Sequence, residues 1–577
     1  MIKSYREEYE KWLSSPVLTQ EERAEIAAIG EDEDTKKLRF GLEMSFGTAG
    51  LRSTMDMGPG CMNVYTVAQT TQALAELILG QGGAARGVAI ACDSRNNAQR
   101  FAETAASVLA ANGIKVYLFD SLRPTPELSF AVIELGCIAG INITASHNPK
   151  EYNGYKAYWE DGAQLNPDQA ATVAAAREKI DVLTGAKKMP LDDAISAGLV
   201  EILDERFDER YLQAVLATVI RPEVIRGAAD TLKIVYTPLH GAGYRLVPEV
   251  LKRAGFRHIY TVDEQMKIDG NFPTVKKPNP EYRDVFALGI EIANEVGSDL
   301  VVATDPDSDR VGVVVRNAEG EFDTVTGNQM GALLLDYIIR ARRAAGTLTA
   351  DDYAVKSIVS TPLADKIAKV QGVTLYNVLT GFKFIGEVIS GYEARGQAGD
   401  YLLGFEESYG YLTGTYARDK DAVGATLLIC EMTAYYAEMG KTLSDALADL
   451  YTTYGVYREH MIDIYMEGLD GIARRRTVME QLRKAPPAQL GGASVAEVSD
   501  FLAGVARELA TGKETPLTLP KTDMLIFALE GGDKVIIRPS GTEPKIKIYF
   551  HASAATSTEV TAKIDRYVAD ARRMAEV

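Results

Sequence analysis

Cysteine and histidine are scarce in this chain of 577 residues, which has four cysteines and five histidines. No two cysteines form a CxxC pair, so the sequence indicates neither a zinc knuckle nor a disulfide framework. The histidines show none of the spacings typical of a metal site. Unpaired thiols suit a reducing compartment, and we expect a cytoplasmic protein.

Long apolar runs and an excess of positive charge are also missing. The most apolar stretch, residues 128–146, contains Glu134 and Asn142 and predicts a buried helix followed by a strand. The charged N-terminus lacks the apolar core of a signal peptide. With 62 Lys and Arg against 80 Asp and Glu, the net charge is −18. We therefore expect neither nucleic acid nor a membrane as a partner, and no pattern indicates an oligomeric state.

The remaining composition is that of an ordinary globular protein, with 46% apolar and 25% charged residues. Three segments, which begin at Gly87, Leu232 and Val355, share the order strand, polar turn, helix, glycine, strand. This order predicts three α/β domains with mixed, largely parallel sheets. In such sheets ligands bind at the carboxyl ends of the strands.

The last hundred or so residues follow a different pattern. An alternating strand at 545–550 and a final helix from about Ser557 predict a smaller α+β domain with an antiparallel sheet. We expect four domains, with these boundaries: 1–205, 206–325, 326–455 and 456–577.

A candidate nucleophile lies in the motif Thr-Ala-Ser-His-Asn-Pro at residues 144–149. Ser146 follows the apolar strand 139–143, and the end of a strand suits an exposed nucleophile. The alternative is a plain polar turn, because Asn-Pro favours turns. The chain contains no Gly-x-Ser-x-Gly elbow, so adjacent Ser and His do not indicate a hydrolase triad.

A candidate metal site lies between two apolar runs, where Asp305, Asp307 and Asp309 alternate along the chain. In an extended segment these positions point to one side, and three crowded carboxylates repel unless a cation neutralises them. All-oxygen ligation favours Mg²⁺. An EF-hand requires Gly and Glu where this chain has Arg310 and Arg316. A solvated acidic turn is the remaining alternative.

Two further loops combine polar side chains with glycine. Residues 538–545, Arg-Pro-Ser-Gly-Thr-Glu-Pro-Lys, form a turn whose arginine, hydroxyls and accessible N–H groups suit a phosphate dianion. Residues 404–410, Gly-Phe-Glu-Glu-Ser-Tyr-Gly, offer carboxylates and a hydroxyl that suit sugar hydroxyls. Taken singly, each could be an ordinary turn.

Together and in this order, the four motifs resemble those of the α-D-phosphohexomutase superfamily over nearly the whole chain. Residues 46–52, the N-terminal extension and the run Arg-Asp-Lys-Asp at 418–421 resemble the longer phosphoglucomutase branch. The resemblance implies three related α/β domains and a C-terminal α+β domain similar to the TATA-box-binding-protein fold.

The resemblance also implies roles for individual residues. Ser146 would be the phosphoserine, and its phosphoryl group would hold Mg²⁺ together with Asp305, Asp307 and Asp309. The implied catalytic residues are Ser146, His147, Lys156, Arg52, Arg310 and Lys420. The implied substrate-binding residues are Thr380, Gly381, Lys383, Glu406, Ser408, Arg538, Ser540, Gly541, Thr542 and Lys547. A lysine would serve as the base only with a lowered pKa.

The sugar loop departs from the phosphomannomutase pattern, in which a His follows shortly after the Ser. Here Gly410 occupies that place, which favours the phosphoglucomutase type, and Phe405 replaces a common glycine. The implied reaction interconverts α-D-glucose 1-phosphate and glucose 6-phosphate, with glucose 1,6-bisphosphate as intermediate and activator.

Several alternatives share these motifs. On the same site they are a phosphomannomutase, a phosphopentomutase or a glucose-1,6-bisphosphate synthase. From other classes they are a metal-dependent sugar phosphatase and a non-catalytic sugar-phosphate-binding protein. In each case the expected partner is a small sugar phosphate.

Overall fold

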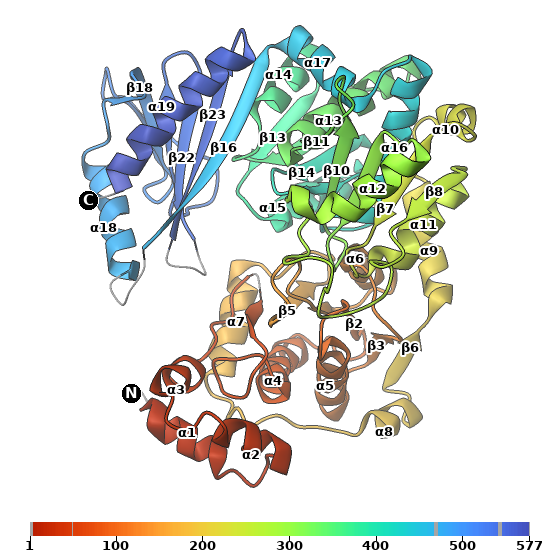
Figure 1. Ribbon diagram of the computed structural model, residues 1–577. Helices are drawn as coiled ribbons and strands as arrows, with labels where there is room; N and C mark the ends of the chain where they lie inside the picture. The colour runs from red at the N-terminus through yellow and green to blue at the C-terminus, as the bar shows by residue number, and fades with distance from the viewer. Residues whose placement is uncertain (1–3, 49, 467–470, 541–544, 576–577) are drawn as a thin grey trace.

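The structure is a computed structural model that describes residues 4–48, 50–466, 471–540 and 545–575. Three α/β units follow one another along the chain, and an antiparallel unit follows them at the C-terminal end (Figure 1). The fold class expected from the sequence is confirmed.

Three short helices lead into the first unit: α1 (Tyr5–Leu13), α2 (Gln20–Ala27) and α3 (Glu33–Phe40). Trp12 is fully buried and anchors them. Its ring meets Phe40 at 6.1 Å and Tyr65 at 5.8 Å between centroids, both nearly edge to face. These contacts fix the N-terminal helices to the first domain.

The first unit is built on a six-stranded sheet. Its strands are β1 (Leu51–Thr54), β2 (Val88–Cys92), β3 (Val116–Phe119), β4 (Ala139–Ile143), β5 (Tyr152–Trp159) and β6 (Val200–Leu203). They lie in the order β1-β5-β4-β2-β3-β6, with β5 antiparallel to both neighbours and the other pairs parallel. Its helices are α4 (Val64–Gly80), α5 (Ala98–Ala111), α6 (Thr125–Glu134), α7 (Pro167–Arg177) and α8 (Leu191–Ser196).

The second unit has five strands: β7 (Lys233–Thr237), β8 (His258–Thr261), β9 (Leu300–Thr304), β10 (Val311–Arg316) and β11 (Phe322–Val325). Their order is β11-β10-β9-β7-β8, in which β10 runs antiparallel to β9 and β11. Its helical segments are α9 (Glu205–Leu216), α10 (Pro222–Ala228), α11 (Gly243–Ala254), η1 (Arg283–Phe286) and α12 (Ala287–Val296).

The third unit has four strands: β12 (Tyr353–Ser357), β13 (Thr374–Val378), β14 (Tyr401–Glu406) and β15 (Gly410–Leu412). Their order is β13-β12-β14-β15, and only β14 and β15 pair antiparallel. Its helical segments are α13 (Gly327–Ala344), α14 (Pro362–Gln371), α15 (Phe382–Glu393), η2 (Ala398–Asp400), α16 (Ala422–Glu438) and α17 (Leu443–Tyr454). The three expected strand–turn–helix–strand segments are thus confirmed as β2-α5-β3, β7-α11-β8 and β12-α14-β13.

One continuous core joins these three units. It contains Phe130 from the first unit, Val247 from the second and Leu403 from the third. Helix α16 explains the continuity, because it follows the third sheet in sequence yet packs against α10 and α11 of the second unit. The carboxyl ends of strands in the three sheets are therefore held in a fixed relation.

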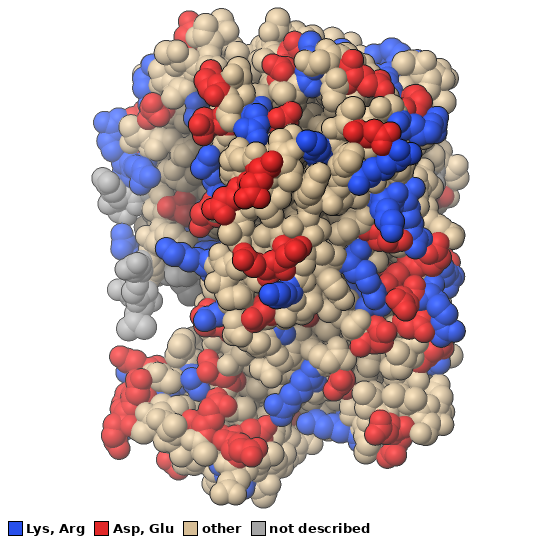
Figure 2. Space-filling model, turned by 45° about the vertical axis from the view of Figure 1, so that its right-hand side comes forward, with Lys and Arg blue, Asp and Glu red and all other residues tan. Residues whose placement is uncertain are grey.

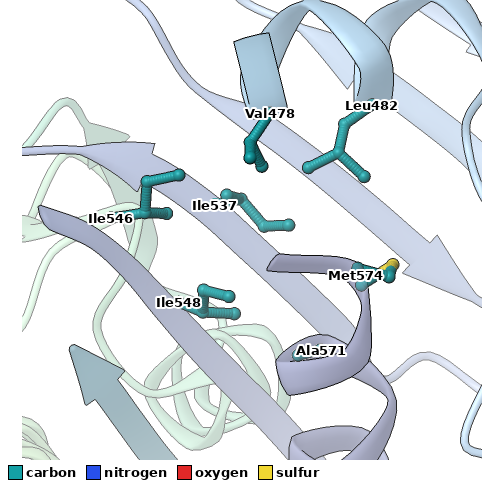
Figure 3. Close-up of a pocket in the computed structure, with 7 residues that line it drawn as sticks. All are labelled: Val478, Leu482, Ile537, Ile546, Ile548, Ala571 and Met574. Carbon is teal, nitrogen blue, oxygen red and sulfur yellow. The ribbon is translucent and has the colours of Figure 1, made fainter. Parts of the chain in front are cut away.

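The C-terminal unit is an antiparallel sheet with two helices on one face (Figure 1). Its strands are β16 (Val456–Tyr465), β17 (Gln489–Leu490), β18 (Ala493–Asp500), β19 (Val505–Glu508), β20 (Glu514–Pro516), β21 (Leu525–Leu529), β22 (Lys534–Pro539) and β23 (Lys545–Ala554). Figure 3 shows Val478 and Leu482 of α18 (Gly471–Lys484), with Ala571 and Met574 of α19 (Ser557–Ala575), over the sheet residue Ile537. This apolar layer is the core of the unit.

The opposite face of the C-terminal sheet is seated on the third unit. Ile536 and Tyr549 share an apolar cluster with Val359 and Leu379. The ring of His551 hydrogen-bonds through Nε2 to the carbonyl oxygen of Val359 at 2.8 Å. Across the described ranges, no helix is both long and apolar enough to cross a bilayer.

Candidate active site

Ser146 lies three residues beyond the end of β4, in a strained turn. Its φ is 51°, a left-handed value that costs a non-glycine residue about 1–2 kcal/mol. The backbone N–H of Ser146 donates to Thr144 Oγ1 at 2.8 Å, and its hydroxyl donates to Asp305 Oδ2 at 2.6 Å. The serine of the first domain therefore touches the acidic motif of the second, as a shared site requires.

The acidic motif forms a tight turn between the antiparallel strands β9 and β10, and the extended conformation expected from the sequence is wrong. Asp305 Oδ1 accepts the backbone N–H groups of Asp309 and Arg310 at 3.1 and 3.0 Å, which closes the turn. Ser308 at its tip has a φ of 52°. The three carboxylates still lie close together, but the turn brings them together and not an extended strand.

These carboxylates fit a metal ion. One oxygen from each of Asp305, Asp307 and Asp309 lies within 4.8 Å of the others, and all three residues are buried. Asp307 Oδ1 and Asp309 Oδ1 have no hydrogen-bond partner among the described residues. Burial and repulsion from the other two carboxylates raise the pKa of Asp305 well above its usual range. A buried, partly unsatisfied cluster of this kind is stabilised by a cation with oxygen ligands.

Two lysines from other domains hold the same carboxylates. Lys156 of β5 donates to Asp307 Oδ2 at 2.7 Å and to Asp309 Oδ2 at 3.2 Å. The ammonium of Lys420 lies 3.1 Å from Asp309 Oδ2 and 2.9 Å from Asp419 Oδ1. Burial opposes the charge of both lysines, but the carboxylates outweigh it and raise both pKa values. Neither Lys156 nor Lys420 therefore has the lowered pKa that a base would need.

Three further residues of the expected catalytic set surround the serine. The ring Nδ1 of His147 lies 3.2 Å from Ser146 Oγ, and burial, with Arg310 and Arg52, lowers the pKa of this imidazole. Arg52 donates to Asn148 Oδ1 at 3.3 Å. Arg310 donates to Glu281 Oε1 at 2.7 Å. The structure thus brings all six expected catalytic residues to one place.

The loops of the third domain present the expected sugar-binding residues. Glu406 ends β14, and its Oε1 accepts the backbone N–H of Gly381 at 2.8 Å. Burial and the adjacent Glu407 raise the pKa of Glu406 to about 7. Burial lowers the pKa of Lys383. Ser408 and Thr380 are half-buried, and the hydroxyl oxygen of Thr380 has no partner among the described residues.

Gly410 has a direct steric reason to be glycine. A Cβ at this position would lie 2.1 Å from Cδ of Lys420, because the aliphatic stem of the lysine crosses over it. A histidine at position 410 and the observed position of Lys420 exclude each other. The departure from the phosphomannomutase pattern noted in the sequence therefore has a physical cause.

The expected phosphate loop is described in part. Arg538 near the end of β22 lies opposite Lys547 of β23, and the N–H of Ser540 donates to the carbonyl of Lys545 at 2.9 Å. Gly541 and Thr542 lie outside the described residues. Figure 2 shows the surface hollowed at its left edge, between the first domain below and the C-terminal domain above.

Some site residues carry no motif that sequence reasoning could use. One is Thr125, which donates to Asp307 Oδ2 at 2.8 Å. Arg95 contacts the serine loop by hydrogen bonds to its carbonyl groups. The one available signal is position, since Arg95 follows β2, the parallel neighbour of β4.

A buried serine on a carboxylate cluster, which lysines of the first and third domains also bind, fits an enzyme that transfers a phosphoryl group. The family models for phosphoglucomutase/phosphomannomutase alpha/beta/alpha domains I, II and III match residues 43–183, 209–320 and 326–454, and the C-terminal domain model matches 493–570. The chain belongs to this family, and so to the α-D-phosphohexomutases, which are intramolecular phosphotransferases.

Individual relatives agree. The phosphoglucomutase of Staphylococcus saprophyticus is 35% identical over 93% of this chain and 95% of its own. Parafusin, a phosphoglucomutase from Paramecium, matches in its open form with a TM-score of 0.65 at 16% identity, over 93% of this chain and 96% of its own. Aspergillus fumigatus N-acetylphosphoglucosamine mutase, solved with GlcNAc-6P and magnesium, matches with a TM-score of 0.52 at 15% identity, over 97% and 100%.

The contact between Gly410 and Lys420 gives a testable prediction. Gly410→Ala should displace the Lys420 ammonium from Asp309 and lower the kcat for hexose phosphate turnover by about 10- to 100-fold, the range typical of a misplaced catalytic group. The matched control is Gly80→Ala, where an added Cβ meets nothing within 4 Å. Equal kcat values for both variants would contradict this role of Gly410.

Proposed function

We propose that the protein interconverts α-D-glucose 1-phosphate and glucose 6-phosphate through a phosphoserine at Ser146. One observation carries the proposal. The Ser146 hydroxyl lies 2.6 Å from Asp305, in a carboxylate cluster of the second domain that a lysine of the first domain and a lysine of the third also bind. The identity to curated phosphoglucomutases over most of the chain supports glucose as the sugar.

The proposed reaction has two transfers. In the first, the Ser146 Oγ–P bond breaks, a bond forms between phosphorus and O6 of glucose 1-phosphate, and the O6 hydroxyl proton passes to Ser146 Oγ. The resulting glucose 1,6-bisphosphate reorients. In the second, the bond between O1 and phosphorus breaks, Ser146 Oγ bonds to that phosphorus, and the serine proton passes to O1, which leaves glucose 6-phosphate. The same bisphosphate, supplied from outside, would phosphorylate the serine and act as activator. Both transfers require that the cleft recognise a phosphate at either end of the sugar.

We propose that Ser146, Asp305, Asp307 and Asp309 hold Mg²⁺, which would offset the charge of the transferred phosphoryl group. The unpartnered oxygens of Asp307 and Asp309 support this assignment. The related Aspergillus fumigatus mutase was solved with magnesium.

The cations of the chain would add to this stabilisation. Lys156 and Lys420 bind the carboxylate cluster, Arg310 Nε lies 3.8 Å from Asp309 Oδ1, and Arg52 donates to Asn148 beside the serine. Fixed positive charges in a water-poor site stabilise a phosphoryl transition state. Burial of Ser146, with 3% of its surface exposed, limits the access of water to the reacting bond.

The substrate itself would bind between the third and fourth domains. Glu406 and Ser408 would accept and donate hydrogen bonds to sugar hydroxyls, beside Thr380, Gly381 and Lys383. The non-reacting phosphate would be bound by Arg538, Ser540, Gly541, Thr542 and Lys547. Tyr549 of the C-terminal sheet shares an apolar cluster with Leu379, the residue before Thr380, which supports a substrate site between these two domains. The four buried, free cysteines support a reducing cytoplasm as the location.

Ser146→Ala tests the proposal directly. Turnover of glucose 1-phosphate should fall to background, because the group proposed to carry the phosphoryl group is removed. The phosphate mass shift should vanish from the peptide containing residue 146. Ser196→Ala, on the exposed surface of α8, is the control. Substantial mutase activity in Ser146→Ala would refute the nucleophile.

Asp307→Asn tests the metal ligands. The Mg²⁺ concentration for half-maximal activity should rise at least about tenfold, since a charged ligand is lost. Titration calorimetry with Mg²⁺ alone checks the same change without turnover. Asp323→Asn, an exposed residue of β11, should behave as wild type. An unchanged titration for Asp307→Asn would remove it from the ligand set.

The raised pKa of Glu406 predicts a pH dependence. Below its pKa of about 7 this carboxyl is protonated, so it loses an anionic acceptor for sugar hydroxyls, and KM should rise as the pH falls from 8 to 6. In Glu406→Gln this part of the pH dependence of KM should disappear. Ionisation of the substrate phosphate changes KM in both enzymes alike. Identical KM profiles for the two enzymes would rule out Glu406 as the titrating group.

A further inference from the structure

The guanidinium group of Arg95 is buried against the serine loop, residues 146–152, and hydrogen-bonds to the backbone of this loop. Nη1 donates to the carbonyl oxygens of Pro149 and Tyr152 at 2.8 and 2.9 Å. Nη2 donates to the carbonyl oxygens of Asn148 at 2.6 Å and of Ser146 itself. Only 3% of Arg95 is exposed. Four carbonyl groups of one seven-residue loop thus share a single side chain.

The charge of this guanidinium is balanced by Asp93, whose Oδ2 lies 3.3 Å from Arg95 Nε. The same Oδ2 accepts the hydroxyl of Thr144 at 2.6 Å, and Thr144 Oγ1 accepts the N–H of Ser146. The serine is therefore held on both sides, through its carbonyl oxygen by Arg95 and through its N–H by way of Thr144 and Asp93.

The second domain covers this pair. The ring of Phe272 lies over the guanidinium at 5.2 Å from its centroid, and Phe272 has a left-handed φ of 47°. A Cβ on Gly270 would lie 2.4 Å from the backbone nitrogen of Asn96, so this loop sits directly on the turn that carries Arg95. Asn96 also donates to Asn271 at 3.1 Å. The domain that supplies the acidic turn thus also fixes the clamp under the serine.

Arginine is the residue that this arrangement requires. Its planar group offers five N–H donors in a fixed fork, whereas a lysine ammonium is a compact charge with three. A lysine at position 95 would keep the charge beside Asp93 but could not reach both ends of the loop. Ser146, in its left-handed conformation, would then lose part of the support that holds its hydroxyl at Asp305.

We propose that Arg95, fixed by Phe272, is a positioning residue for Ser146, and that it determines whether the phosphoryl group passes to a sugar hydroxyl or to water. The inference rests on the proposed function. In both outcomes the Ser146 Oγ–P bond breaks. The new bond to phosphorus comes from a sugar hydroxyl oxygen in productive transfer, and from a water oxygen in hydrolysis, which releases inorganic phosphate.

The test compares wild type with Arg95→Lys after both have been phosphorylated by glucose 1,6-bisphosphate. For Arg95→Lys we expect kcat to fall about 10- to 100-fold, the cost of a small misplacement, with KM within about twofold of wild type. The fraction of phosphate released to water, relative to transfer to glucose 1-phosphate, should rise. A residue that only stabilised the fold would change neither the ratio nor kcat in the folded fraction.

Two further variants keep the test decisive. Arg123→Lys is the control, because Arg123 is also buried and its guanidinium group donates to Asp208 at 2.6 Å and to Ser121 and Leu122, none of which belongs to the serine loop. It should lower the melting temperature and leave the partition ratio unchanged. If Arg95→Lys does not fold, Phe272→Leu tests the same clamp, since it keeps an apolar cover and removes the ring. We expect about a threefold rise in the released fraction for this variant.

The inference would be overturned if Arg95→Lys had the kcat of wild type and released the same fraction of phosphate to water. Where only Phe272→Leu folds, the same result for that variant would overturn it. Failure of the proposed function is a separate result, namely a wild-type enzyme without turnover. In that case, amide hydrogen exchange over residues 146–152 still decides the matter. Faster exchange in Arg95→Lys than in Arg123→Lys supports the clamp, and equal exchange overturns it.

Discussion

The structure depends on one electrostatic constraint: three carboxylates are buried together in the turn that follows β9. Such a cluster is costly unless cations from elsewhere approach it. Lys156 comes from the first domain and Lys420 from the third, and both reach Asp309. The site is therefore complete only when three domains are in place, and the shared core around α16 holds these domains together.

Backbone strain is concentrated around the same place. Of the seven non-glycine residues with positive φ in the described chain, five lie at the site or at the Arg95 clamp: Asn97, Ser146, Phe272, Ser308 and Tyr409. Each such conformation costs on the order of 1–3 kcal/mol and persists only where its surroundings enforce it. Packing between domains thus stabilises loop conformations that each domain alone would not favour, and these loops carry the reacting groups.

The fourth domain contributes differently. Its residues Ile536 and Tyr549 pack with Val359 and Leu379 of the third domain, and His551 hydrogen-bonds to Val359. Tyr457 of β16 packs against the core that joins the first three domains. The proposed phosphate-binding role of Arg538 would therefore depend on how this domain is seated on the third.

The amino-acid sequence was enough to predict the fold class, and to single out the serine and the three aspartates that meet in the structure. These features are local: a polar motif after an apolar strand marks the end of that strand wherever the domain lies. Three features could be seen only in the folded chain: the carboxylates meet in a turn, Gly410 makes room for Lys420, and Arg95 hydrogen-bonds to the serine loop. Those contacts join segments far apart in the chain, and a hydrogen bond from a guanidinium to backbone carbonyls leaves no trace in the identity of the residues that accept it.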